Sequence, residues 1–122
     1  MDQASVALRS VVKTFVNPND GSDVEVIRQV DEDVQRAEFV CLLGPSGCGK
    51  STLLEIIGGL QSATRGEIYI LGKKVTSPHP DAAMVFQEDS LFPWRSVLGN
   101  LEFGMEARGI PRKERREKAR EI

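Results

Sequence analysis

The chain has 122 residues, of which 28% are charged, and its 16 lysines and arginines against 18 acidic residues give a net charge of −2 at pH 7. A chain of this length builds one domain or less, and without a basic excess we expect no nucleic acid as a partner. The first residues lack the basic-then-apolar pattern of a secretory signal, and no apolar run is long enough to span a bilayer, so we expect a soluble, cytoplasmic protein.

The first part of the chain has the pattern of two paired strands. Residues 6–15 are rich in β-branched and other apolar side chains, and residues 24–34 again favour a strand. Between them, residues 17–23 form a dense cluster of turn residues. The pattern predicts an antiparallel pair.

A glycine-rich loop follows an uninterrupted apolar run. Residues 39–43 are all apolar, as expected of a central parallel strand that is covered on both faces. The next residues have the spacing G-x-x-x-x-G-K-S, in which glycines turn backbone N–H groups towards phosphates, Lys50 reaches the terminal phosphates and Ser51 offers a hydroxyl to Mg²⁺. The predicted nucleotide-binding residues of this loop are Gly44, Pro45, Ser46, Gly47, Cys48, Gly49, Lys50, Ser51 and Thr52.

The residues after this loop predict a helix whose positive N-terminal end points at the phosphates. The helix is expected to stop at Gly58 and the glycine after it. Its apolar face is formed by Leu53, Ile56, Ile57 and Leu60.

The two cysteines are predicted to be free thiols. Cys41 lies in the apolar run and Cys48 in the phosphate loop, and a bridge between them would distort the loop. Cys48 is either a small residue that the loop tolerates or a thiol whose modification blocks nucleotide binding.

Further strands are predicted after the helix. Residues 66–71 and 74–76 have the pattern of a hairpin with Gly72 at its turn. Residues 77–81 contain two prolines and form a rigid loop, and residues 82–86 are another buried strand.

Beyond residue 86 the character of the sequence changes. Residues 87–95 combine large apolar groups with polar neighbours and lack helix or strand periodicity, which is typical of a functional loop. We therefore divide the chain into residues 1–86 and 87–122.

Two helices are expected in the second part. Ser96 caps the first, with Val97, Leu101 and Met105 on one face. Residues 112–122 form the second, with a supporting pair between Glu114 and Lys118. Its basic residues are interleaved with glutamates, which indicates a solvated helix face.

The motifs together resemble a known family. The phosphate loop, G-E-I at residues 66–68, M-V-F-Q at residues 84–87 and L-F-P-W at residues 91–94 resemble the ATP-binding subunit of an ABC transporter, most of all the nitrate, sulfonate and taurine importers. The resemblance covers residues 6–122 and implies an α/β fold, the truncated N-terminal half of a P-loop NTPase of the ABC type. An antiparallel β subdomain and the start of a parallel core sheet would occupy residues 1–86, and the Q-loop and the start of a helical subdomain residues 87–122.

The resemblance also implies ATP and Mg²⁺ as ligands. Phe15 stands where the family has an aromatic that stacks on adenine, a contact worth about 1–3 kcal/mol by analogy with nucleic-acid stacking, although a phenylalanine at a strand end is also an ordinary core residue. Gln87 matches the Q-loop glutamine of the catalytic site, which joins Ser51 near Mg²⁺ and reports the γ-phosphate state to the membrane partner.

Partners follow from the same resemblance. The family lodges a short cytoplasmic helix of a transmembrane permease subunit beside the loop that contains Phe92 and Trp94, and exposed aromatics suit such docking. The alternative is that both rings close a local core. The intact parent would pair with a second ATP-binding subunit at the cytoplasmic face of the plasma membrane and import a small oxidised anion or similar solute.

The 122 residues depart from the family in three places. They contain no L-S-G-G-Q signature, no apolar strand ending in Asp-Glu after the phosphate loop and no switch histidine. Asp31 and Glu32 precede the loop, and His79, between two prolines, is expected at the surface. We therefore expect the intact parent to be an ATPase and this chain to bind ATP with little or no hydrolysis. The alternatives are a non-catalytic nucleotide-binding remnant or interaction protein, and another P-loop enzyme, although no N-K-x-D guanine-reading sequence occurs.

Overall fold

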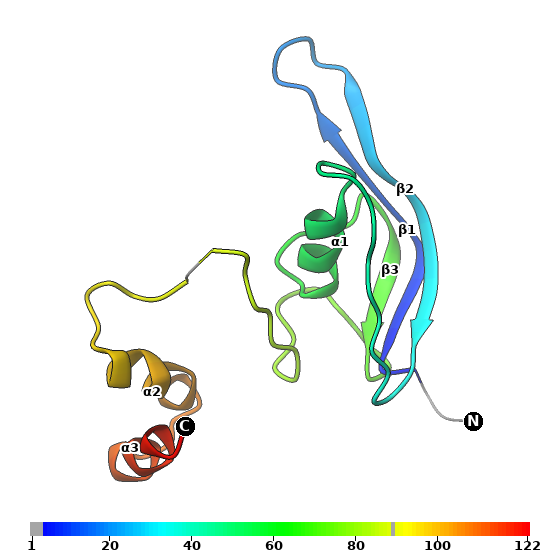
Figure 1. The fold of residues 1–122 in the computed structure, drawn as a ribbon. Coiled ribbons are helices and arrows are strands. Elements are labelled where there is room, and N and C mark those ends of the chain that lie inside the picture. The colour runs from blue at the N-terminus through cyan, green and yellow to red at the C-terminus, as the bar shows by residue number, and fades with distance from the viewer. Residues whose placement is uncertain (1–3, 89) are drawn as a thin grey trace. The chain divides into compact units, whose positions relative to one another are not determined.

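The structure is a computed structural model that describes residues 4–88 and 90–122. Its internal contacts group the chain into two units, one that ends at Met84 and one that covers Val85–Ile122. Figure 1 shows the helices and strands of each. The roles that the sequence analysis assigns to residues 1–86 and 87–122 remain predictions.

The first unit contains an antiparallel sheet in the order β2-β1-β3-β4, of which Figure 1 labels β1, β2 and β3. Its strands are β1 (Val6–Val16), β2 (Asp23–Val34), β3 (Arg65–Ile70) and β4 (Lys73–Lys74). β1 pairs with β2 from Val6 opposite Val34 to Val16 opposite Asp23, and with β3 on its other side. The predicted antiparallel pair and the predicted hairpin are both confirmed, the second with a shorter last strand.

Both hairpin turns contain residues that suit their backbone. Between β1 and β2, the N–H of Gly21 donates to the carbonyl oxygen of Asn17 at 2.8 Å. Between β3 and β4, Leu71 and Gly72 have φ values of 48° and 74°. Two successive positive φ angles match the twist of the strands that a tight hairpin joins.

β1 carries a bulge at Ser10, whose φ is 49°, and the register shifts there on both sides of the strand. The backbone N–H of Ser10 donates to Asp31 Oδ1 at 2.7 Å. Hydrogen bonds from Gln29 and Ser10 lower the pKa of the Asp31 carboxyl. Asp31 therefore secures the bulge.

The helix α1 (Lys50–Ile57) packs on one face of this sheet (Figure 1). It ends at Gly58, whose N–H donates to the carbonyl oxygen of Leu54 at 2.8 Å. Leu60, predicted on the apolar face, is exposed, because the helix has ended and Gly59, with φ 75°, redirects the chain. The core of the unit is formed by Leu8, Val11, Ile27, Leu53, Ile56 and Ile68.

The parallel strand predicted at residues 39–43 and the buried strand predicted at residues 82–86 are not formed. Phe39 is 90% exposed and Val85 95% exposed. A parallel strand needs a neighbour that runs in the same direction, and within the described ranges every strand pair is antiparallel. Cys41 is exposed for the same reason, and both cysteines are free, as predicted.

The second unit contains α2 (Val97–Ala107) and α3 (Arg112–Arg120). Ser96 Oγ accepts from the N–H of Gly99 at 3.1 Å, which confirms the predicted cap. The predicted pair of Glu114 and Lys118 is confirmed at 2.8 Å. None of the helices in the described residues is long and apolar enough to cross a membrane.

Of the three residues predicted on the apolar face of α2, Met105 is half-buried. Val97 and Leu101 are exposed, whereas Glu102 is buried. The side of α2 that packs on α3 contains Glu102, which forms ion pairs with arginines of α3. Periodicity selected the apolar residues, but a buried carboxylate and its arginine partners also lie at the contact between the two helices.

We expect Ile56→Ala to lower the free energy of unfolding of the first unit by about 2–5 kcal/mol, because this side chain is fully buried in the core. Leu54→Ala, on the exposed side of the same helix, is the matched control and should change it by about 0.5 kcal/mol or less. Urea unfolding followed by far-UV circular dichroism measures both. Equal losses would contradict the observed packing of α1.

Candidate functional site

The phosphate loop leads directly into α1. Gly49 is the N-cap residue of this helix with φ 100°, and Gly47 has φ 80°. Glycine adopts such angles without a steric penalty. A β-carbon on Gly49 would also lie 2.8 Å from Val26 Cγ1 of β2, so the loop runs close against the sheet.

The side chain of Lys50 is turned into this loop. Its Nζ donates to the carbonyl oxygens of Gly44 at 2.8 Å and Pro45 at 2.7 Å, and lies 3.5 Å from Cys48 Sγ. A phosphate group that enters the loop would replace these neutral acceptors with charged oxygens, which form stronger hydrogen bonds with an ammonium group. The loop therefore already holds the ammonium group of Lys50, which can exchange its carbonyl acceptors for phosphate oxygens.

The N-terminal end of α1 is open to an anion. No side chain caps it, and its first turn, which lies within the described residues, has no acidic residue. The first N–H groups of a helix have no acceptor within the helix, and they favour a bound phosphate. Ser51 is exposed and Thr52 half-buried in the same turn. Ammonium, hydroxyl and backbone N–H donors thus belong to one short stretch of chain that suits a polyphosphate.

Mg²⁺ fits this site as part of a nucleotide complex. In the part of the chain that the structure describes, no three His, Cys, Asp or Glu side chains gather to hold a metal. Mg²⁺ is commonly held by few protein oxygens together with substrate phosphates and water, and the exposed hydroxyl of Ser51 is an oxygen of this kind. Gln87, the second predicted ligand, is exposed in the second unit, and its role stays a prediction.

Phe15 lies near the end of β1, opposite Val24 of β2. Its side chain is 39% exposed, which leaves part of the ring accessible to a ligand. The Nζ of Lys13 lies 4.9 Å from the centre of this ring. The sequence does not single out Lys13, because a contact between a cation and a ring has no sequence signature. The stacking role of Phe15 stays a prediction.

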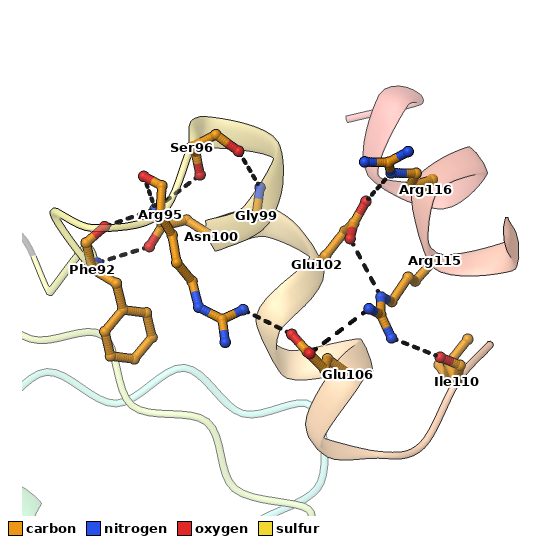
Figure 2. A network of polar contacts seen from close by, with 10 residues as sticks. All are labelled: Phe92, Arg95, Ser96, Gly99, Asn100, Glu102, Glu106, Ile110, Arg115 and Arg116. Carbon is orange, nitrogen blue, oxygen red and sulfur yellow. Dashed lines mark hydrogen bonds and ion pairs between the residues drawn. The ribbon is translucent and has the colours of Figure 1, made fainter. Parts of the chain in front are cut away.

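Asn100 fixes the loop before α2 (Figure 2). Its Oδ1 accepts from the N–H of Phe92 at 2.8 Å. Its Nδ2 donates to the carbonyl oxygens of Phe92, Arg95 and Ser96 at 3.2, 3.3 and 3.0 Å. One side chain thus satisfies several backbone groups of an irregular segment. The sequence does not indicate this role of Asn100 either, because at its position it indicates only that the residue belongs to a helix.

Aromatic rings pack together in the same unit. The ring centre of Phe92 lies 4.6 Å from that of Phe103 and 5.3 Å from that of Trp94. The guanidinium carbon of Arg95 lies 5.1 Å from the centre of the Phe103 ring. Phe92 is half-buried and Trp94 is 77% exposed. Phe92 therefore belongs to the local core, and Trp94 is the member of the predicted docking pair that a partner can reach.

Two glutamates of α2 connect this loop with α3 (Figure 2). Glu106 accepts from Arg95 at 2.7 Å and lies 3.7 Å from Arg115, and the hydrogen bond from Arg95 lowers the pKa of Glu106. Glu102 is 7% exposed and accepts from Arg115 Nε at 3.3 Å. Its Oε1 lies 3.3 Å from Arg116 Nε without a hydrogen bond. Charged contacts therefore order the second unit.

His79 is not the surface residue that was predicted. Its side chain is 9% exposed, and its Nδ1 accepts from the backbone N–H of Asp81 at 3.2 Å. The turn between the two prolines therefore shields the ring, and the backbone N–H of Asp81 occupies its Nδ1.

The chain is similar to proteins with related descriptions. A sequence model of the family described as "ABC transporter" matches residues 27–122. An uncharacterized ABC transporter ATP-binding protein of Methanocaldococcus jannaschii is 42% identical over 121 residues, which are 99% of this chain and 45% of that protein. A nitrate import ATP-binding protein of Synechocystis is 47% identical over 92 residues, which are 75% of this chain and 35% of that protein.

Further matches agree. An sn-glycerol-3-phosphate import ATP-binding protein of Bordetella pertussis is 42% identical over 118 residues, 94% of this chain and 31% of that protein. A solved dimeric bacterial ABC transporter cassette superposes with a TM-score of 0.83 and 32% identity, over 95% of this chain and 54% of the cassette. The α/β fold of an ABC-type P-loop NTPase is thereby confirmed. This chain spans less than half the length of these curated relatives.

We expect the contact between Arg95 and Glu106 to weaken in acid. Because the pKa of Glu106 lies below its usual value of 4.5, the contact contributes fully above pH 4.5 and is lost as the pH falls through the lowered pKa. Trp94, the single tryptophan, reports on this loop by its fluorescence. Its emission should change in that acid range.

Glu106→Gln should remove this part of the fluorescence change, because the amide does not titrate. Glu114→Gln is the matched control, since Glu114 pairs with Lys118 on α3, and it should keep the change. A Glu106→Gln titration that matches that of the unchanged protein would contradict the role given to the pair.

Proposed function

The chain belongs to the family of ABC transporter ATP-binding proteins, and on that premise we propose that it binds ATP with Mg²⁺ at the phosphate loop, as the ATP-binding component of an importer. The observation that carries this proposal is the position of Lys50. Its ammonium group lies inside a glycine loop, against the carbonyl oxygens of Gly44 and Pro45, at the open N-terminal end of a helix.

The residues of the loop would act on the phosphates. Lys50 would pass from the two carbonyl oxygens to the terminal phosphates of ATP, and the first N–H groups of α1 would bind the remaining oxygens. Ser51 would contribute its hydroxyl to Mg²⁺, which offsets phosphate charge when bound. Phe15 would stack on adenine. Gln87 would lie near the γ-phosphate, as the Q-loop glutamine of the family does.

The partners belong to the same proposal. Trp94, largely exposed beside the half-buried Phe92, offers an aromatic anchor to a transmembrane permease subunit. A second ATP-binding subunit would complete the site, and the similar solved cassette is described as dimeric. The assembly would lie at the cytoplasmic face of the plasma membrane.

We also propose a small oxidised anion of the nitrate, sulfonate and taurine kind as the transported solute. The relative from Synechocystis is named for nitrate import. Another relative is named for import of sn-glycerol-3-phosphate, which is also an anion. These names support an anionic solute, and the finer choice rests on the nitrate importer alone.

Lys50→Ala should weaken binding of Mg-ATP by about 1.5–3 kcal/mol, the range for hydrogen bonds to charged groups. Isothermal titration calorimetry with the 122-residue chain measures the change. Lys73→Ala, an exposed lysine of β4, is the matched control and should leave the affinity unchanged. An affinity that does not respond to Lys50→Ala would refute the phosphate-binding role of the loop.

The chain alone should bind ATP with little or no hydrolysis. Its 122 residues contain no signature sequence, no Asp-Glu strand end after the loop and no switch histidine, and these are the groups that the family uses, together with the glutamine matched by Gln87, for hydrolysis at the γ-phosphate. A phosphate-release assay under saturating Mg-ATP measures the rate. Release at ordinary enzyme rates that Lys50→Ala abolishes would contradict this expectation and would also disfavour a non-catalytic remnant.

A further inference from the structure

Lys13 makes two contacts that the proposed function does not use. Its Nζ donates to the carbonyl oxygen of Ser62 at 2.7 Å and lies 4.9 Å from the centre of the Phe15 ring. A cation within about 6 Å of a ring centre is attracted by the negative face of the ring. The ammonium group is therefore held at the one aromatic ring that is predicted to meet adenine.

The segment that contains this carbonyl oxygen is bound to β1 two residues further on, at Thr64. The N–H of Thr64 donates to the carbonyl oxygen of Val12 at 2.8 Å. The N–H of Thr14 in turn donates to Thr64 Oγ1 at 2.9 Å. The segment between α1 and β3 is thus bound to the same stretch of β1 that presents Lys13 and the ring.

This stretch lies close to the phosphate loop. Lys13 is opposite Ile27 and Phe15 is opposite Val24 in the pairing of β1 with β2. Between these positions, Val26 is the residue that a β-carbon on Gly49 would meet. Because a strand rises about 3.4 Å per residue, the ring lies within a few residues of the point where the loop meets the sheet.

We propose that Lys13 is a positioning residue for the nucleobase, an inference that rests on the proposed ATP-binding function. Its ammonium group holds the Phe15 ring in one orientation, so that a planar base stacks on a ring that is already ordered. A ring held in its bound orientation loses less conformational freedom on binding, which raises affinity. The phosphates do not depend on this contact, because the loop binds them through Lys50 and the start of α1.

The test compares a ligand that has a base with one that has none. Lys13→Met keeps most of the length of the side chain and removes its charge. It should weaken Mg-ATP binding about two- to fivefold, the range for an exposed cation–ring contact, and leave binding of Mg-tripolyphosphate unchanged. Lys13→Arg keeps a cation over the ring and should retain the affinity for ATP. Lys73→Met is the matched control and should change neither ligand.

Each outcome of this test either supports the inference or overturns it. If Lys13→Met left ATP binding unchanged, the inference would be overturned. If it weakened ATP and tripolyphosphate by the same factor, Lys13 would serve only to tether the Ser62 segment, and the inference would again be overturned. Lys50→Ala distinguishes a failure of this inference from a failure of the proposed function. ATP binding that responds to Lys50→Ala and not to Lys13→Met removes this inference alone, whereas ATP binding indifferent to Lys50→Ala removes the proposed function as well.

Discussion

The burial of α1 against the sheet is the contact on which the phosphate loop depends. An isolated helix of eight residues is not stable in water, so α1 exists because Leu53 and Ile56 pack into the core with Leu8, Val11, Ile27 and Ile68. The N-terminal end of the helix carries Gly49 and Lys50 with it. Apolar burial on one side of the helix therefore fixes the position of a charged, exposed loop at its end.

The second unit is ordered by a different kind of interaction. Glu102 is buried at the contact between α2 and α3, and a buried carboxylate is stable only if cations compensate its lost hydration. Arg115 and Arg116 provide that compensation, and Glu106 extends the same chain of charges to Arg95. The loop that presents Trp94 is thus held by Asn100 and by ion pairs, rather than by a large apolar core.

The sequence predicts those features that depend on neighbours in the chain. The strands at residues 6–15 and 24–34, the helix after Lys50 and the cap at Ser96 follow from local periodicity, glycine and hydroxyl positions, and the structure contains them. The contact of Lys13 with Phe15, two residues further along the same strand, could not be predicted, because it depends on the conformation of both side chains. Asn100 beside four backbone groups could not be predicted, because the irregular path of the loop brings those groups to it. The burial of Glu102 could not be predicted either. Only its arginine partners on α3 make a charged side chain favourable at the contact between the two helices.

The segment at residues 39–43 shows what an apolar pattern does and does not determine. The pattern indicates a tendency to be buried, worth about 1.5–3 kcal/mol for each large side chain that leaves water. It does not specify which element of the fold packs over the segment. Phe39 and Leu43 are almost fully exposed, as is Val85 in the buried strand predicted at residues 82–86. Both segments precede a loop with a proposed ligand or metal role, at Lys50 and Gln87. A parallel strand positions such a loop only when a neighbouring strand runs beside it in the same direction, and the antiparallel sheet of the described residues provides no such neighbour. The phosphate loop is therefore held here on its helical side, by the packing of α1. On its other side, the segment that leads into the loop at residue 43 would need neighbouring strands to fix its position.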